Sequence, residues 1–373
     1  AHLPNLVRQV MAEAGAGFAE LGGVAASCGP GLIGGLIVGA GVGKGIALAH
    51  GLPFVAVNHL EAHALTARLP GLVPGGAPFP YLLLLLACSL PAFGAGITED
   101  LTKNVSPRRR LIATAVSAGL AIWLLDSVII KTDIPGVDLL IRWAPVSVLL
   151  TVFVVTGVAN AVNIIDGFNG LASMCVLMMI LALGYVAFQV GDTFVFTAAL
   201  ITAGAVMGFF VWNFPAGLIF LGDGGAYLLG FLLGELSILL VHRNPGVSPM
   251  FPLLLCAYPI FETIFTMYRR KVVRGVATAA PDGIHLHTLI HRRLIRWTLA
   301  EGREKRRLTR RNSMTSPYLW LLCLSSVIPS LLWWNSTAVL SWFLLLFVVS
   351  YVWLYTRIVR FKTPRWLIFR RTG

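Results

Sequence analysis

Polar side chains stand at regular spacing in one otherwise apolar stretch, Asn160 to Gly170. Asn160, Asn163 and Asp166 follow one another at intervals of three residues, and on a helix this spacing puts them along one face. Asn169 adds another polar side chain in the sequence Asp-Gly-Phe-Asn-Gly. Because polar and ionisable groups are costly inside a membrane, such a set predicts a site for an ion or a ligand. The alternative is a glycine-broken helix end capped by amides.

Three further segments carry residues of the same kind. They are Gly96 to Lys103 with Glu99 and Asp100, Asn213 to Gly225 with Asp223, and Asp282 to His287 with His285. Carboxylates interspersed with asparagines form the oxygen-rich ligand set that Mg²⁺ prefers, with Mn²⁺ as the alternative ion. A Mg²⁺ ion held by one or two carboxylates usually shares its other positions with water and substrate phosphates, which predicts phosphoryl chemistry. Taken singly, these residues also fit helix caps, solvent-exposed acids or a basic loop.

The composition sets these motifs in a membrane protein. Hydrophobic residues make up 57% of the 373 residues and charged residues only 12%, far from the balance of a soluble domain. Windows of roughly 20 residues predict an all-α polytopic membrane protein with about nine transmembrane helices. The expected spans are 80–97, 111–130, 144–162, 171–188, 193–212, 224–241, 250–268, 317–334 and 337–355.

The basic residues predict the orientation. The C-terminal tail and the connections that share its side together hold 23 Lys and Arg residues, against Lys131, Arg142 and Arg243 on the other side. By the positive-inside rule the first side is cytoplasmic, and all four motifs lie on it. The net charge of +13 is therefore an orientation and lipid-headgroup signal that needs no nucleic-acid partner. We expect a multi-pass protein of a bacterial inner membrane.

Residues 1–79 differ from the rest. They balance three basic against three acidic side chains, and a Pro/Gly-rich stretch from Pro70 to Pro80 marks a boundary near 80. The sequences from Ala25 to Gly35, after Lys44 and from Asn58 to His63 resemble the tRNA threonylcarbamoyladenosine transferase subunit family over residues 1–86. The resemblance implies an α/β-derived, soluble-like N-terminal fragment in which His59 and His63 bind a metal. The nucleotide-binding strands and second lobe of that family are absent, so we expect an incomplete, dispensable domain.

Residues 82–300, with the motif Asn-x-x-Asn-x-x-Asp-Gly, resemble the polyprenyl-phosphate N-acetylhexosamine-1-phosphate transferase family. The resemblance implies transfer of a sugar-1-phosphate from a UDP-N-acetylhexosamine to undecaprenyl phosphate, with release of UMP and a need for Mg²⁺. It assigns Asp223 to the metal and Glu99, Asp100 and Asp166 to catalysis. Together with the polar spacing and the basic charge of Lys103, it predicts a substrate-binding set: Lys103, Asn160, Asn163, Asn169, Asn213, His285 and His287.

The chain departs from this family in two motifs and in length. The acidic pair is Glu-Asp instead of Asp-Asp, and Asn169 replaces the second aspartate of the usual pattern, which favours the surface-glycan branch that includes O-antigen precursors. Members commonly have eleven spans, so the membrane domain, 80–373, is expected to lack the first two. Other readings are a transporter or flippase with a proton path through Asp126 and Asp166, or an inactive fusion product. A homodimer and a two-step route through an enzyme carboxylate are left open.

Overall fold

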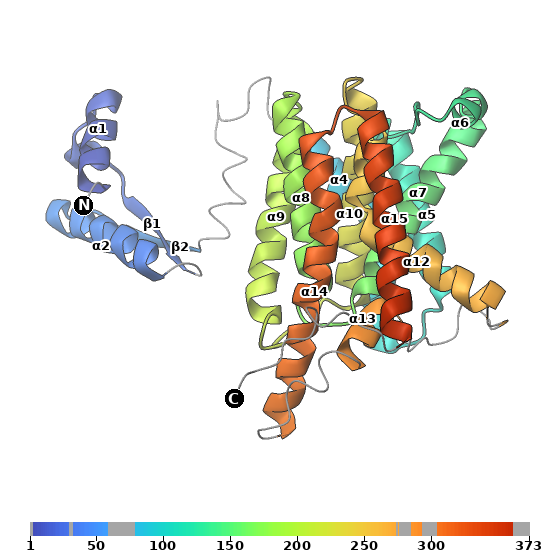
Figure 1. The fold of residues 1–373 in the computed structure, drawn as a ribbon. Coiled ribbons are helices and arrows are strands. Elements are labelled where there is room, and N and C mark those ends of the chain that lie inside the picture. Colours follow the sequence, from blue (N-terminus) through green and yellow to red (C-terminus); the bar gives the residue numbers. More distant parts are fainter. Residues whose placement is uncertain are drawn as a thin grey trace. The chain divides into compact units, whose positions relative to one another are not determined.

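The chain folds into two compact units, residues 1–77 and 78–373. The computed structural model describes residues 3–29, 33–58, 79–273, 275, 285–292 and 304–360. Figure 1 shows the helices and strands of both units. The predicted metal ligands His59 and His63 lie outside the described residues.

The first unit is a small α/β fragment. Helix α1 (Leu3–Ala14) and the short turn η1 (Phe18–Glu20) precede strand β1 (Val24–Gly29), helix α2 (Ile33–His50) and strand β2 (Phe54–Asn58). The two strands pair in parallel, with Ala26 opposite Ala56. Since parallel neighbours need a crossover connection, α2 provides it, as in any strand-helix-strand unit. The predicted α/β-derived N-terminal fragment is therefore confirmed.

The second unit is helical throughout its described part. Its elements are α4 (Phe79–Thr102), α5 (Pro107–Leu125), α6 (Pro135–Leu140), α7 (Ala144–Ile165), α8 (Leu171–Gln189), α9 (Thr193–Asn213), α10 (Gly222–Arg243), α11 (Met250–Leu255), α12 (Ala257–Tyr268), the π-helical turn η2 (Arg269–Val273), α13 (Leu286–Ile290), α14 (Glu304–Leu332) and α15 (Thr337–Val359). We call it the membrane unit below.

Among the described residues, seven helices are long and apolar enough to cross a membrane: α4, α7, α8, α9, α10, α14 and α15. This confirms a polytopic all-α protein, although the expected number of nine is not confirmed. The segment predicted at 111–130 forms α5, but the helix ends at Leu125 because Asp126 takes a left-handed conformation, with φ at 54°. The segment predicted at 250–268 is interrupted at Cys256, which leaves two short helices, α11 and α12.

Helix α10 forms the centre of the membrane unit. Of its apolar window 78% is buried inside the protein, against 17% for α15. It packs on α4 and α7 through small residues: a Cβ atom added to Gly230 would lie 2.5 Å from the Ala159 Cα. Such close approach of backbones is typical of helix packing in lipid, where small residues replace the hydrophobic driving force.

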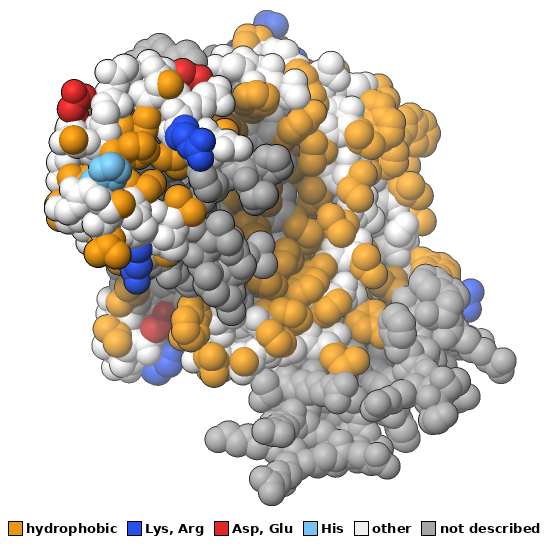
Figure 2. Space-filling view, turned by 90° about the vertical axis from the view of Figure 1, so that its left-hand side faces the viewer, with side chains coloured by type: hydrophobic (Ala, Val, Ile, Leu, Met, Phe, Trp, Pro, Cys, Tyr) orange, Lys and Arg blue, Asp and Glu red, His pale blue; other side chains and the backbone are white. Residues whose placement is uncertain are grey.

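The flanks of the membrane unit are apolar. Figure 2 shows hydrophobic side chains spread over the flank that it presents, and exposed residues of α9 include Leu200, Met207 and Val211. The described cysteines of this unit are buried and form no disulfide: Cys88, Cys175, Cys256 and Cys323.

Candidate active site at the start of helix α10

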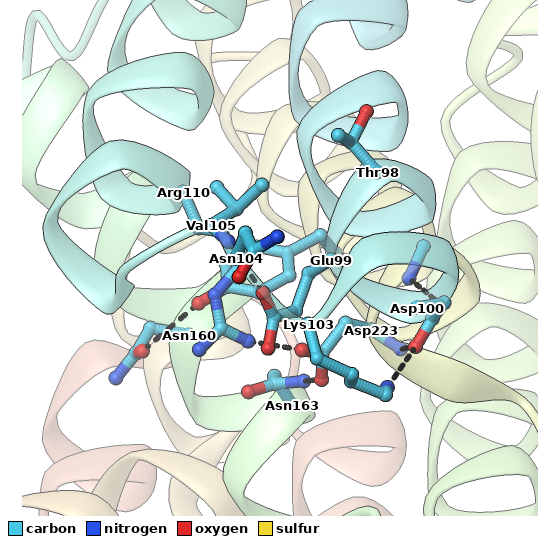
Figure 3. Close-up of polar contacts among 12 residues, drawn as sticks. Thr98, Glu99, Asp100, Lys103, Asn104, Val105, Arg110, Asn160, Asn163 and Asp223 are labelled. Atoms are coloured by element: carbon cyan, nitrogen blue, oxygen red, sulfur yellow. Dashed lines mark hydrogen bonds and ion pairs between the residues drawn. The ribbon is translucent and has the colours of Figure 1, made fainter.

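The acidic pair of α4 lies in the last turn of that helix. Lys103 ends α4 with a left-handed backbone, φ at 55°, and the chain then turns into α5, where Ser106 caps the new helix. Glu99 Oε2 accepts a hydrogen bond of 2.7 Å from the Val105 backbone N–H (Figure 3). Glu99 thus holds the turn between α4 and α5, and its neighbour Asp100 is left to face α10.

Asp100 caps the N-terminus of α10. Its two carboxylate oxygens accept hydrogen bonds from the backbone N–H groups of Asp223, at 3.0 Å, and Gly224, at 2.9 Å. A negative charge is favourable here because the helix dipole and unpaired N–H groups make a helix start electropositive. Gly222, with φ at 69°, permits the approach, since a Cβ there would lie 2.6 Å from Asp100 Oδ2. Lys103 Nζ lies 3.7 Å from Asp100 Oδ1, on the outer side of the pair.

Asp223 joins three helices. The Arg110 guanidinium of α5 forms a close ion pair with Asp223 Oδ2, and Asn163 Nδ2 of α7 donates a 2.6 Å hydrogen bond to Oδ1 (Figure 3). The Arg110 guanidinium also lies 5.7 Å from the centre of the Tyr227 ring. The Tyr227 hydroxyl donates to Asn160 Oδ1 at 3.4 Å. A carboxylate, a guanidinium and two amides therefore meet at the first turn of α10.

Asp166 follows the last residue of α7 and is not part of the helix. Its backbone N–H still bonds the Asn163 carbonyl at 3.2 Å, so the expected single helical face holds for Asn160 and Asn163 and ends before Asp166. Burial, with further contributions from the charges of Asp223 and Asp100, raises the pKa of Asp166 from 3.8 to about 7. Three carboxyl groups thus repel one another at this end of the bundle.

Asn169 and Asn213 hold the loops around the site together. Asn213 accepts a 2.6 Å hydrogen bond from the Gly170 N–H and donates one of 2.7 Å to the Ile219 carbonyl. Asn169 is 4% exposed and contacts α14: its amide nitrogen donates to the Ser313 hydroxyl at 3.4 Å, and the Ser316 hydroxyl donates to the Asn169 backbone carbonyl at 2.6 Å. Both side chains are occupied by backbone and helix-helix contacts, and the substrate-binding role predicted for them stays a prediction.

The two histidines lie on the other side of the turn that follows α7. His285 Nδ1 is 3.1 Å from Glu262 Oε1 of α12. The His287 ring is 95% buried and packs edge-on to Phe168, with ring centres 5.5 Å apart. It also faces Gly167, where an added Cβ would lie 3.0 Å from His287 Nε2. His287 therefore contacts the residues directly after Asp166.

The structure brings together Asp100, Asn160, Asn163 and Asp223, and electrostatic coupling adds Asp166. Arg110 and Tyr227 join this group in the structure. In the sequence Arg110 belongs to a run of three arginines, 108–110, which could hold phosphate charge but which after a membrane helix is by default an orientation signal. Tyr227 was not predicted as a site residue. It stands four residues after Asp223 and therefore on the same face of the helix. This spacing identifies Tyr227 as a site residue only when the face of α10 that carries the site is known.

The donor set suits a hard divalent cation. Asp100, Asp166, Asp223 and Asn163 offer oxygen atoms. Burial is the main cause of the raised pKa of Asp166, and the charges of Asp223 and Asp100 add a repulsion that a cation would relieve. Within the described part of the chain, no group of three or more His, Cys, Asp and Glu side chains is placed to hold a metal ion. In proteins Mg²⁺ commonly takes one or two carboxylates and completes its shell with substrate phosphates and water.

Comparison with known proteins supports both resemblances. Residues 82–241 match the family model described as Glycosyl transferase family 4. Residues 1–88 match the model described as tRNA N6-adenosine threonylcarbamoyltransferase. The recognition of both families in one chain is therefore confirmed over these residues, and for the membrane unit it supports a glycosyl transferase at the level of the family.

Two curated relatives carry the name of the family that matches residues 1–88. The tRNA N6-adenosine threonylcarbamoyltransferase of Granulibacter bethesdensis is 56% identical over 92 residues, 23% of this chain and 25% of that protein. The protein of the same name from Paramagnetospirillum magneticum is 61% identical over 85 residues, 23% of each chain. This chain spans about a quarter of the length of these relatives.

Proposed function

We propose that the membrane unit transfers an N-acetylhexosamine-1-phosphate from a UDP-sugar to undecaprenyl phosphate, producing undecaprenyl-diphospho-sugar and UMP. The site faces the cytoplasm of an inner membrane, and the product starts a surface-glycan precursor. The observation that carries the proposal is the meeting of Asp100, Asp223, Arg110 and Asn163 at the end of an apolar helix bundle. Such a site suits a lipid-borne phosphate and a soluble, phosphate-rich donor, which can meet only at the membrane surface.

The charges of the site suit phosphoryl transfer. Asp223 would hold Mg²⁺, and the bound ion would neutralise part of the charge of the diphosphate. Asn163 orients the Asp223 carboxylate through its 2.6 Å hydrogen bond, and Asp100 fixes the first turn of α10 on which Asp223 stands. Arg110 balances Asp223 and offers positive charge to a substrate phosphate.

Asp166 is the residue best suited to handle a proton. Without a bound cation its pKa of about 7 divides it between its acid and its carboxylate forms at neutral pH, which is the condition for efficient proton exchange. In the proposed reaction an oxygen of the lipid phosphate attacks the sugar-linked phosphorus, and the bond from that phosphorus to the bridging oxygen of UMP breaks. Asp166 accepts a proton from the lipid phosphate if that phosphate arrives protonated.

The test measures UMP release by membranes that contain the full chain, with undecaprenyl phosphate, Mg²⁺ and a panel of UDP-amino sugars. We expect release that needs the lipid, one of the sugars and the metal together, with Mn²⁺ as a second ion to compare. Release without the lipid phosphate indicates simple hydrolysis. An absence of release with every sugar in the panel refutes the proposal and favours an inactive fusion product.

The transporter reading loses support from the positions of its two acids. Asp126 Oδ2 is 3.8 Å from His242 Nε2, near the end of α10, whereas Asp166 is coupled to Asp223 at its beginning. At 1.5 Å per residue the 19 residues between 223 and 242 correspond to roughly 28 Å. The two acids therefore lie at opposite ends of the bundle.

A further inference from the structure

A buried hydrogen-bond network surrounds Glu262, an acid to which the proposed transfer assigns no role. Glu262 lies on α12 and is fully buried. Its Oε1 accepts hydrogen bonds from the Leu286 backbone N–H and from His285 Nδ1, both at 3.1 Å. Its Oε2 accepts a short hydrogen bond from the Tyr351 hydroxyl of α15. One carboxylate thus connects two helices with the segment 285–292.

The geometry of the network fixes that segment at its first residues. The Leu286 N–H belongs to the first turn of α13, where no intrahelical partner exists for it, so Glu262 acts as a cap supplied by another helix. Thr266, one turn further along α12, adds a contact of 3.2 Å to His285 Nδ1. Removing the carboxylate leaves a buried N–H group without its acceptor, which is a costly state.

The segment held in this way reaches the candidate active site through His287. The rings of His285 and His287 are stacked, with centres 5.1 Å apart and planes at 11°. On its other side His287 lies against Gly167 and Phe168, in the turn that follows Asp166. A continuous line of contacts therefore runs from Tyr351 through Glu262, His285 and His287 to the residues beside Asp166.

We propose that Glu262, backed by Tyr351, is a positioning residue: it holds residues 285–292 so that His287 packs on the turn carrying Asp166. This inference rests on the proposed function for its effect on turnover. Glu262 acts on the reaction through His287, since a displacement of about 1 Å in a catalytic group lowers rates by up to a hundredfold.

The first experiment is a double-mutant cycle on UMP release. We expect Glu262→Ala to lower kcat/KM about tenfold or more. Glu262→Gln keeps an acceptor oxygen for the Leu286 N–H and should recover a large part of the lost kcat/KM. Tyr351→Phe should lower kcat/KM less than Glu262→Ala. Combined with His287→Ala, Glu262→Ala adds no further loss, because both changes act on one unit. An equal, multiplicative loss in the double variant overturns the proposal.

The second experiment does not depend on activity. Leu289, on α13, is 4% exposed, so a cysteine placed there reacts slowly with maleimide, and peptide mass spectrometry follows its labelling. Glu262→Ala raises the labelling rate at least tenfold. Glu235→Gln is the matched control, because Glu235 is also fully buried but stands on α10, roughly 18 Å along the helix from Asp223. We expect it to change neither labelling nor turnover.

The two experiments separate the inference from the proposed function. A parent chain that releases no UMP from any donor refutes the transfer, and the labelling at position 289 then decides alone whether Glu262 holds the segment. Labelling that stays slow in Glu262→Ala overturns the inference, whether or not the parent chain is active.

Discussion

Replacing Asp223 with Asn separates the structural from the chemical contribution of this side chain. The ion pair with Arg110 is partly buried, with side chains 13% exposed for Arg110 and 26% for Asp223. A hydrogen bond to a charged group is worth about 1.5–3 kcal/mol when shielded, and the remaining exposure lowers this to about 1–2 kcal/mol. At about 2–4 °C per kcal/mol for a protein of this size, we expect the melting temperature to fall by only a few degrees.

The effect of the same change on turnover is much larger. A metal ion contributes several kcal/mol of charge stabilisation in a transition state, and about 3 kcal/mol corresponds to a hundredfold in rate. We therefore expect Asp223→Asn to lose at least a hundredfold in UMP release and to show no response to added Mg²⁺. The assay is UMP release across a Mg²⁺ titration, with thermal unfolding in detergent alongside.

Arg110→Gln is the matched control, because it breaks the same ion pair and keeps the carboxylate. We expect a similar fall in melting temperature, with residual turnover that still rises with Mg²⁺ and saturates at equal or lower concentrations. If Asp223→Asn keeps most of its turnover at saturating Mg²⁺, the metal is held elsewhere, and the role given to Asp223 is wrong.

Three further predictions follow from the site, the packing and the charge distribution. Folding raises the pKa of Asp166 to about 7, so between pH 4 and 7 the folded chain keeps a proton on Asp166 that the unfolded chain has released. The stability of the metal-free protein therefore falls as pH rises through this window. Asp166→Asn should flatten that fall in thermal unfolding, and an unchanged slope contradicts the assignment. Gly230→Ala should cost about 1–3 kcal/mol by forcing α7 and α10 apart, whereas Gly157→Ala, which meets open space, should be neutral or slightly stabilising. Cysteines at the exposed positions 106 and 246 should react only from the cytoplasm and only from the periplasm, respectively, and the reverse pattern would overturn the orientation.

The sequence by itself determined the class of fold and the chemical type of the site. Apolar length is a local property, so each predicted span contains a helix, and the two that do not qualify as membrane spans fail for local reasons: three arginines, 108–110, in the first turn of α5 and a break at Cys256. The acidic and amide residues at the helix ends likewise indicate an oxygen-rich site by their residue types alone.

Only the tertiary structure decided which of those side chains face one another. Arg110 and Asp223 are 113 residues apart, and no periodicity in either helix reveals that the guanidinium pairs with that carboxylate. Asn169 and Asn213, which look like site residues in the sequence, have their side chains directed to α14 and to the neighbouring loops. Glu262 is an isolated acid within an apolar stretch of the sequence, and only the fold places its partners on α13 and α15 beside it. Helix packing sets these partners, since it depends on the shapes of all the helices at once and not on the residues near each motif.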